Sequence, residues 1–189
     1  ATVQLAADTT TVNTSVKKVA ADVNAVKDAT GVEAVAITKG KIHTVGATGV
    51  ISFDLAGNHT TGAAATFYDV TATLTATSDL DPLVDAINAH AANTGITAVL
   101  GSAASEIILT HQTGETIEIK ALSIGGSTNA TIEVSALDKF GNATTTKDTT
   151  LARAANSFTS VITLGNTGTA GVKARGHVLG QMTLNSIKS

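Results

Sequence analysis

The chain lacks cysteine entirely and is poor in aromatic residues. Of its 189 residues none is Cys or Trp, one is Tyr and one is Pro, and aromatic residues make up 3%. The absence of Cys excludes disulfides, thiolate zinc sites and cysteine nucleophiles. The scarcity of large rings argues against a concave small-molecule pocket, because such rings line most of these sites.

Charge is also sparse. Charged residues are 14% of the chain, the net charge is −3, and no Lys/Arg cluster forms a track for phosphates. This composition argues against nucleic-acid binding. No apolar run approaches the roughly 20 residues of a membrane span. Residues Ala1–Gln4 lack the pattern of a secretory signal, so we expect a mature or excised fragment, or export without a cleaved leader.

The chain is rich in Ala, Val, Ile, Leu and Thr. Part of its sequence occurs twice. Residues Val23–Ala25 and Thr30–Val35 reappear as Ile87–Ala89 and Thr94–Val99, at an offset of 64. Apolar spacing and turn residues repeat, whereas charged and polar positions drift. This pattern indicates a duplicated packing unit and not a duplicated active site.

Each copy predicts a helix followed by a strand. In the first copy an apolar stripe of five Val predicts a helix from Thr11 to Ala29, with Thr10 or Thr11 as N-cap and Gly31 as C-cap. In the second copy Ser78 and Asp81 read as a capping box, Pro82 suits the first turn and Gly95 ends the helix. The buried stripe of this second helix is Leu80, Leu83, Val84, Ile87 and Ala91.

The other segments alternate apolar and polar residues and predict strands. These strands are residues 32–38, 50–55, 66–76, 96–100, 107–109, 116–120, 131–134, 161–164 and 178–184. A hairpin is expected to turn at Thr113–Gly114. Because each helix must bury its stripe, we predict an α+β fold: antiparallel β-sheets each packed by an amphipathic helix, in duplicated β-β-α-β-β units, with a β-rich C-terminal part.

We expect three segments. Residues 1–56 form a first, degenerate unit and residues 57–136 a second. Residues 137–189 form a β-rich segment that packs on the first unit. The residues expected to matter most for packing are Val16, Val23, Leu83, Ile87, Val35 and Val99.

Candidate metal sites are weak. The five His residues, which are His43, His59, His90, His111 and His177, show no metal-ligand spacing. Asp79, Asp81 and Asp85 suggest a calcium loop, but they lie at a helix start where Asp is favoured, and no distal Glu follows. We therefore predict no metal and no cofactor.

Candidate catalytic and modification sites are equally weak. The glycines Gly165, Gly168 and Gly171 lack the Lys-Ser/Thr of a phosphate loop and read as a flexible loop. Ser and Thr are plentiful but occur in no Gly-x-Ser-x-Gly motif. Asn-x-Ser/Thr triplets occur at Asn13, Asn58, Asn129 and Asn142, as expected by chance in a Thr-rich chain. O-linked glycans on exposed Ser/Thr are the more plausible modification.

The repeated residues resemble the "flagellin IN" motif of bacterial flagellins and hook-associated cap proteins. The resemblance is carried by Ile51–Gly57, Asp79–Ala89, Thr94–Ala98 and Glu106–Thr110, and covers residues 50–122 well and 12–55 weakly. It implies the surface-exposed outer region of a flagellin, extracellular and without catalysis. The terminal helices that build a filament core are absent from this sequence, so we expect an excised, monomeric fragment that joins other flagellin subunits through segments missing here.

Two other interpretations remain open. The motif also occurs in hook-associated and cap proteins, so a binding or adhesin-type module is the alternative. An enzyme would require His90 to meet Asp85 or Asp81 in one pocket. Nothing in the sequence itself reaches the standard of an enzyme site.

Overall fold

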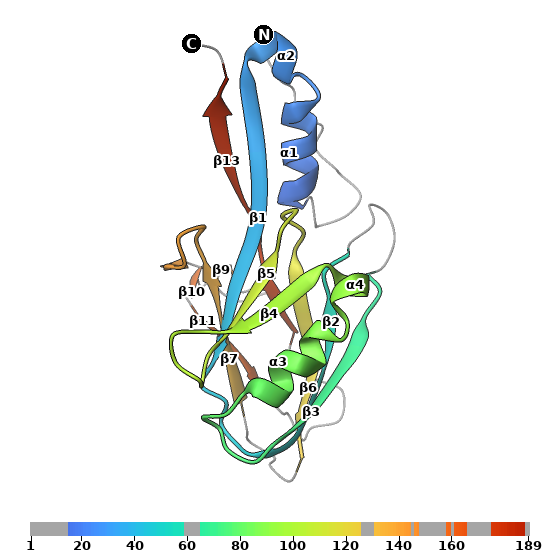
Figure 1. The fold of residues 1–189 in the computed structure, drawn as a ribbon, viewed down its shortest axis with the longest axis vertical. Helices are drawn as coiled ribbons and strands as arrows, with labels where there is room; N and C mark the ends of the chain where they lie inside the picture. Colours follow the sequence, from blue (N-terminus) through green and yellow to red (C-terminus); the bar gives the residue numbers. More distant parts are fainter. Residues whose placement is uncertain are drawn as a thin grey trace.

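A computed structural model describes most of the chain in an elongated arrangement of two large sheets, a two-stranded ribbon and two helical segments. The described residues are 15–58, 65–125, 131–144, 146–147, 158–159, 161–165 and 175–187. A wide body holds α3, α4 and most of the strands, and a narrow end carries α1, α2, β13 and the first half of β1 (Figure 1).

The first helical segment is shorter than predicted and is interrupted. Helix α1 spans Val16–Asn24 and α2 spans Lys27–Thr30. Ser15, with extended backbone, caps α1 by accepting a hydrogen bond from the Lys18 backbone N–H. The predicted N-caps, Thr10 and Thr11, lie outside the described residues. The predicted C-cap is confirmed, because Gly31 ends α2 at a φ of 69°.

The second helical segment repeats this arrangement. Helix α3 spans Asp81–Asn88 with Pro82 in its first turn, and α4 spans Ala91–Thr94 and ends at Gly95, whose φ is 71°. The predicted capping box is wrong. Leu80 is the N-cap and makes no side-chain cap bond. Leu80 is fully buried, so the start of α3 is held by apolar packing.

The larger sheet has the strand order β11-β7-β1-β5-β4. Its strands are β11 (Val161–Gly165), β7 (Thr131–Leu137), β1 (Val32–His43), β5 (Ile107–His111) and β4 (Ile96–Leu100). The first half of β1 continues beyond this sheet and pairs with β13 (Gln181–Ser186). The short β8 (Ala143–Thr144) pairs with β7.

The smaller sheet has the order β12-β6-β2-β3. Its strands are β12 (Arg175–Val178), β6 (Ile117–Ile124), β2 (Gly49–Ala56) and β3 (Tyr68–Leu74). A separate two-stranded ribbon joins β9 (Thr146–Lys147) to β10 (Phe158–Thr159). Every strand pair named here is antiparallel, and the α+β class is confirmed.

Two strand predictions are wrong in an informative way. Strands β5 and β6 form no hairpin, because β5 pairs with β1 and β4, whereas β6 pairs with β2 and β12. The turn at Thr113–Gly114 therefore carries the chain from one sheet to the other. The strand predicted over 178–184 is split at Leu179–Gly180, so that β12 and β13 also lie in different sheets.

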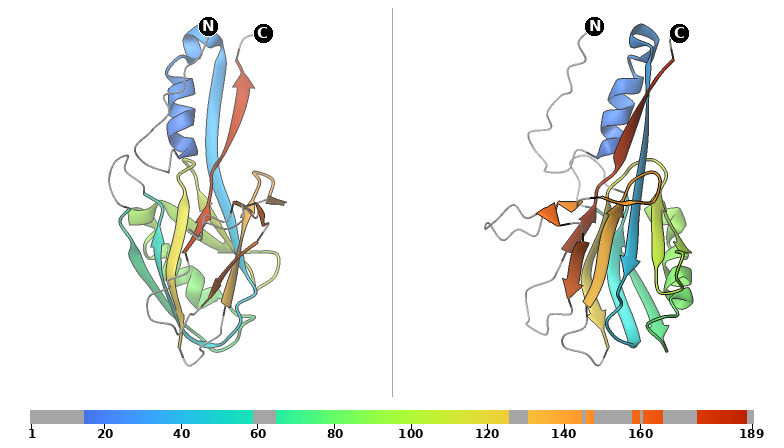
Figure 2. Two further views of the ribbon diagram at one scale, coloured as in Figure 1. Left: turned by 180° about the vertical axis from the view of Figure 1, so that it is seen from behind. Right: turned by 90° about the vertical axis from the view of Figure 1, so that its left-hand side faces the viewer.

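The main core lies between the two sheets and is closed by α3, which contacts β3 and β4, the edge strands of the two sheets (Figure 2). Leu83 and Ile87 are fully buried in it, as predicted. A second, small cluster of Ala20, Ala34 and Ala36 joins α1 to β1, with Val16 and Val23 packed against it.

The packing role predicted for Val35 and Val99 is wrong. These side chains are 51% and 59% exposed. Strand alternation explains the error. Ala34 and Ala36 on β1, and Ile96 and Ala98 on β4, take the buried positions, so the valines between them point to the opposite face.

Candidate functional site

The repeated residues form the same pair of hydrogen bonds twice, between an Asn side chain and the backbone of a strand. The Asn88 side chain donates to the Ala98 carbonyl at 2.9 Å and accepts from the Ala98 backbone N–H at 2.8 Å. The Asn24 side chain makes the same two bonds to Ala34, both at 2.8 Å. We call each pair an asparagine clip. Each clip fixes the end of one helix to the strand that follows it.

The turn between clip and strand is also repeated. The Thr94 hydroxyl donates to the His90 carbonyl at 3.0 Å and accepts from the Ile96 N–H at 3.2 Å. Thr30 makes the corresponding bonds to Val26 and Val32. Position 95 requires glycine, because its φ is 71° and a Cβ there would lie 2.5 Å from the His111 Nε2 atom. The repeated residues therefore serve the fold internally.

Each clip also occupies a strand edge. The N–H and C=O of one residue in an antiparallel strand point to the same side. Ala98 gives both groups to Asn88, and β4 is the terminal strand of its sheet, so the clip covers the outer edge of β4. Ala34 likewise gives both groups to Asn24, on the side of β1 that faces away from β13.

The structure brings together one constellation that resembles a hydrolase triad. His43 on β1 has its Nε2 atom 2.8 Å from the Ser135 Oγ and its Nδ1 atom 3.4 Å from a Glu133 oxygen. A serine, a histidine and a carboxylate in this order can perform acyl transfer when the serine reaches substrate. Ser135 is only 3% exposed, however, and the Nδ1 atom lies nearer to the Thr44 hydroxyl, at 3.1 Å. The geometry suits a cross-strand polar contact better than a nucleophile.

Sequence reasoning missed this constellation. Glu133 and Ser135 alternate along β7 and so share a face, which the sequence shows. Their partner His43 lies 92 residues away from Ser135, and only the pairing of β1 with β7 brings it there. No local spacing signals such a contact.

A shallow depression of about 320 Å³ adjoins His43. It is lined by His43, Thr44, Val45, Thr77, Ser78, Ser105 and Glu106. Glu106 accepts a hydrogen bond from the Lys41 ammonium at 2.7 Å, and this bond holds the pKa of the carboxyl below its ordinary value of 4.5. The carboxylate is thus charged at neutral pH and paired, so it is poorly suited to act as a general acid or base.

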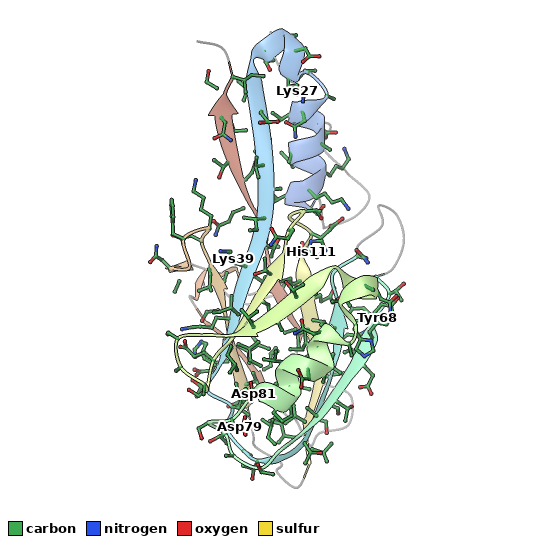
Figure 3. All side chains as sticks on the ribbon, viewed as in Figure 1. Lys27, Lys39, Tyr68, Asp79, Asp81 and His111 are labelled. Carbon is green, nitrogen blue, oxygen red and sulfur yellow. The ribbon has the colours of Figure 1, made fainter. Side chains whose placement is uncertain are left out.

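The other predicted candidates do not converge. Asp79 and Asp81 are exposed at the start of α3 (Figure 3), where the Asp79 carboxylate accepts from the Asp81 N–H at 3.3 Å. His90 lies against the Tyr68 ring, and Asp85 is exposed on α3. Within the described residues no group of three or more His, Asp and Glu is placed to hold a metal ion. His59, Gly168 and Gly171 lie outside those residues, and Gly165 ends β11.

In the two Asn-x-Ser/Thr triplets that the structure describes, the Asn side chain already makes a hydrogen bond within the protein. The Asn58 side-chain amide donates to the Asn93 carbonyl, and the Asn142 amide donates to the Asp138 carboxylate at 3.0 Å. A glycan on either nitrogen would have to displace that bond. Asn13 and Asn129 lie outside the described residues.

One buried carboxylate marks the junction between the narrow end and the body. Glu115 is 4% exposed, and its carboxylate pairs with the Lys17 ammonium of α1 at 3.2 Å. Its carbonyl accepts a 2.6 Å bond from the Thr38 hydroxyl of β1. These contacts tie α1 and β1 to the segment that joins β5 to β6.

Comparison with known proteins assigns the central part of this fold. Residues 51–113 match the family model described as the Flagellin hook IN motif, over about a third of the chain. The match runs from β2 to just beyond β5 and confirms the resemblance to a flagellin-type outer region. A search of curated proteins finds no match.

The motif gives the chain a flagellin-related structural role in the flagellum. The flagellin family is structural and its members assemble with other flagellin subunits into a filament, which is extracellular. In the part of the chain that the structure describes, no helix is both long and apolar enough to cross a membrane.

Proposed function

We propose that this flagellin-related chain is the surface-exposed outer part of a flagellin, displayed to solvent along the filament and without catalytic activity. The observation that supports this proposal is that the distinctive residues of the motif make contacts within the domain. Asn88, Thr94 and Gly95 all bond or pack inside the domain. A module whose recurrent residues stabilise its own fold is suited to act as a rigid scaffold that carries variable loops.

The proposal includes the partners. The chain assembles with other flagellin subunits in the filament, and its exposed Ser and Thr carry O-linked glycans. On its own it is expected to be monomeric. The division into segments 1–56, 57–136 and 137–189 belongs to the same proposal.

The test is the position of this chain on intact flagella. Fab fragments raised against the purified chain, detected with gold in electron micrographs of the source bacterium's flagella, should decorate the whole length of the filament. Antibodies against a denatured core peptide such as Leu83–Ile87 serve as the matched control. They should not label, because Leu83 and Ile87 are fully buried.

The motif is named for the hook as well as for flagellin, and this favours one alternative: a hook-associated, filament-cap or adhesin-type binding module. Gold confined to the tip or to the hook–filament junction would replace the flagellin proposal with this one. Binding of the purified chain to mucin or to a glycan array would identify the adhesin form.

The absence of catalysis has its own test. A fluorophosphonate probe labels serines that are activated by a histidine. We expect no labelling of the native chain, because Ser135 is 3% exposed. Labelling that is lost in both Ser135→Ala and His43→Ala would show that the triad-like constellation is an active site.

A further inference from the structure

The shallow depression described above lies where three connections of the wide body meet. Thr44 comes from the β1–β2 connection, Thr77 and Ser78 from the β3–α3 connection, and Ser105 from the β4–β5 connection. In Figure 3 the label of Asp79, the residue after Ser78, marks the second of these connections. Binding residues are often carried by loops on a rigid scaffold, and none of the four lining residues named here belongs to the buried core.

Three hydroxyls of the depression are available to a ligand. Thr77 and Ser78 form the tip of a turn that the Asp79 N–H closes on the Ala76 carbonyl at 3.3 Å, and both are exposed. Ser105 is half-buried. Within the part of the chain that the structure describes, none of these three hydroxyls makes a hydrogen bond to the protein. Each can therefore donate one hydrogen bond to a ligand and accept another.

The two ionisable side chains of the depression are already held in place. Glu106 accepts hydrogen bonds from the Lys41 ammonium at 2.7 Å and from the Ser102 hydroxyl at 3.4 Å. The His43 ring is fixed by the contact between its Nε2 atom and the Ser135 Oγ at 2.8 Å. Groups that are fixed before binding cost a ligand less entropy than groups that must be ordered. The polar lining is therefore preorganised.

Thr44 contributes a strained backbone to the lining. Its φ is 55°, in the left-handed region that β-branched residues rarely adopt. Ala121 is the other non-glycine residue with a positive φ in the described ranges, and it does not line the depression. The Thr44 hydroxyl lies 3.1 Å from the His43 Nδ1 atom. Strain of this kind concentrates at ligand sites, where the surrounding structure holds it.

The lining selects against apolar and charged ligands. An apolar ligand would gain little, because Val45, the aliphatic side chain in the lining, is only 7% exposed. An acidic ligand would meet the Glu106 carboxylate, and no Lys or Arg lines the depression. A cationic ligand would have to compete with Lys41 for that carboxylate. The ligand that fits is an uncharged molecule with several hydroxyls on a small frame.

We propose that this depression is a binding site for a neutral saccharide. Hydroxyls of the sugar donate to the Glu106 carboxylate and exchange hydrogen bonds with Ser78 and Ser105, and the bond to the charged acceptor is the strongest of these. The volume of about 320 Å³ lies at the lower end of the range for ligand pockets, about 300–1,000 Å³, which suits a mono- or disaccharide. The site goes beyond the proposed function, because display on a filament requires no ligand.

The first test is a titration of the full chain followed by proton–nitrogen correlation spectra. Glucose, galactose, mannose and N-acetylglucosamine are the probes, and at least one should produce saturable shifts at Thr44, Thr77, Ser78 and Ser105. N-acetylneuraminate, an acidic sugar, should produce none, because its carboxylate would meet that of Glu106. The methyl glycoside of the sugar that binds separates two sources of the ligand. A site for the end of a glycan chain accepts it, whereas a site for the free sugar does not.

Two pairs of variants locate the site. Ser105→Trp should abolish the shifts by filling the depression, whereas Thr97→Trp, on an exposed position of β4 outside the lining, should bind like wild type. Ser78→Ala leaves the depression open and removes one hydroxyl, so it should weaken binding about three- to tenfold. Thr73→Ala removes an exposed hydroxyl of β3 outside the lining and should not weaken it. Circular dichroism of each variant checks that the fold is kept.

Three results would overturn the proposal. One is the absence of saturable shifts with all four neutral sugars. Another is binding that stays unchanged in folded Ser105→Trp and Ser78→Ala. The third is equal binding of N-acetylneuraminate, which would exclude selection by Glu106. None of these results affects the labelling of filaments, because that labelling tests where the chain lies and not what it binds.

Discussion

At the scale of single residues, the most consequential side chains are Asn24 and Asn88. Each satisfies a backbone N–H and a backbone C=O at once, as a neighbouring strand would, but does so from a helix end. An amide is the one uncharged side-chain group that offers a donor and an acceptor in this geometry. Asp at these positions would lose the donor, and Gln would place the amide one methylene too far.

Asn88→Ala should lower the free energy of unfolding by about 1–3 kcal/mol, since it leaves both backbone groups of Ala98 without their partner. Urea denaturation monitored by circular dichroism measures the change. The matched control, Asn93→Ala, lies on the exposed face of α4 and should stay within about 0.5 kcal/mol of wild type. Equal effects of the two substitutions would show that the clip is dispensable.

The Lys41–Glu106 pair predicts a dependence of stability on pH. The hydrogen bond from Lys41 lowers the pKa of Glu106 from 4.5 in the folded chain, so the folded state prefers the charged carboxylate. The stabilisation is fully present above pH 4.5 and is lost as the pH falls through the lowered folded value. It is small, below about 1 kcal/mol, because both side chains are partly exposed.

The measurement is the difference in unfolding free energy between wild type and Glu106→Gln. This difference should be largest at neutral pH and vanish in acid below the folded pKa. A difference that grows as the pH falls would contradict the assigned direction. Glu133→Gln, whose carboxylate contacts His43 on the same sheet, provides a comparison for general effects of removing one negative charge.

At the scale of elements, the second copy of the repeat is the stronger one. Its helix α3 buries Leu83 and Ile87 completely and its N-cap Leu80 is also fully buried, whereas α1 buries only Ala20. Since hydrophobic stabilisation follows the apolar area removed from water, α3 contributes far more to stability than α1. The offset of 64 residues therefore relates two units of equal geometry and unequal strength.

Leu83→Ala and Ile87→Ala should each lower the free energy of unfolding by about 2–5 kcal/mol, because they open a cavity in the closed core beneath α3. Val99→Ala and Val35→Ala should each change it by less than about 0.5 kcal/mol, because both valines are more than half exposed. Thermal or chemical melts of the four variants would check this ranking. Exposed and buried positions that melted alike would refute the arrangement of α3.

Local patterns in the sequence predicted the elements well and their partners poorly. The stripe of α3, the glycine stops at Gly31 and Gly95 and strand β4 follow from spacing alone. The sequence did not reveal that the turn at Gly114 leads to another sheet, because a turn residue specifies a bend and not the strand that receives it. A Cβ at Gly114 would collide with Ala36, a contact that exists only once β1 is in place.

The prediction that Val35 and Val99 lie in the core was wrong for a related reason. Val35 and Val99 are more apolar than their neighbours, so hydrophobicity favoured them for the core. Ala34 and Ala36 of β1 pack with Ala20 of α1, and the alternation of the strand then turns Val35 outward. The contact between His43 and Ser135 could not be predicted either, because it depends on the register of β1 against β7.

At the scale of the whole molecule, β1 links two bodies of very different size. Its second half lies inside the larger sheet, between β5 and β7, and its first half leaves that sheet to pair with β13 and pack on α1 (Figures 1 and 2). The buried cluster at the narrow end consists of three alanines, whereas the main core takes residues from both sheets and α3. Stability within one protein follows such local differences in burial.

We therefore predict that the narrow end opens without unfolding of the body. Native-state amide exchange should show α1 and β13 exchanging through an opening of much lower free energy than β2 and β6. Val23→Ala, which trims a side chain packed on the small cluster, should lower the opening free energy of α1 and β13 by about 1 kcal/mol. It should leave β2 and β6 unchanged, since their buried residues belong to the separate main core.

The junction at Glu115 decides how far this opening spreads. Lys17→Met removes the ion pair that ties α1 to the body and leaves the buried Glu115 carboxylate without its cation, which destabilises the closed state more than the loss of a surface pair would. We expect faster exchange in α1 and in the first half of β1, and no change in the second half of β1, which β5 and β7 hold on both sides. Exchange that accelerates equally along all of β1 would mean that the chain opens as one cooperative unit, and the narrow end would then be a rigid extension of the body.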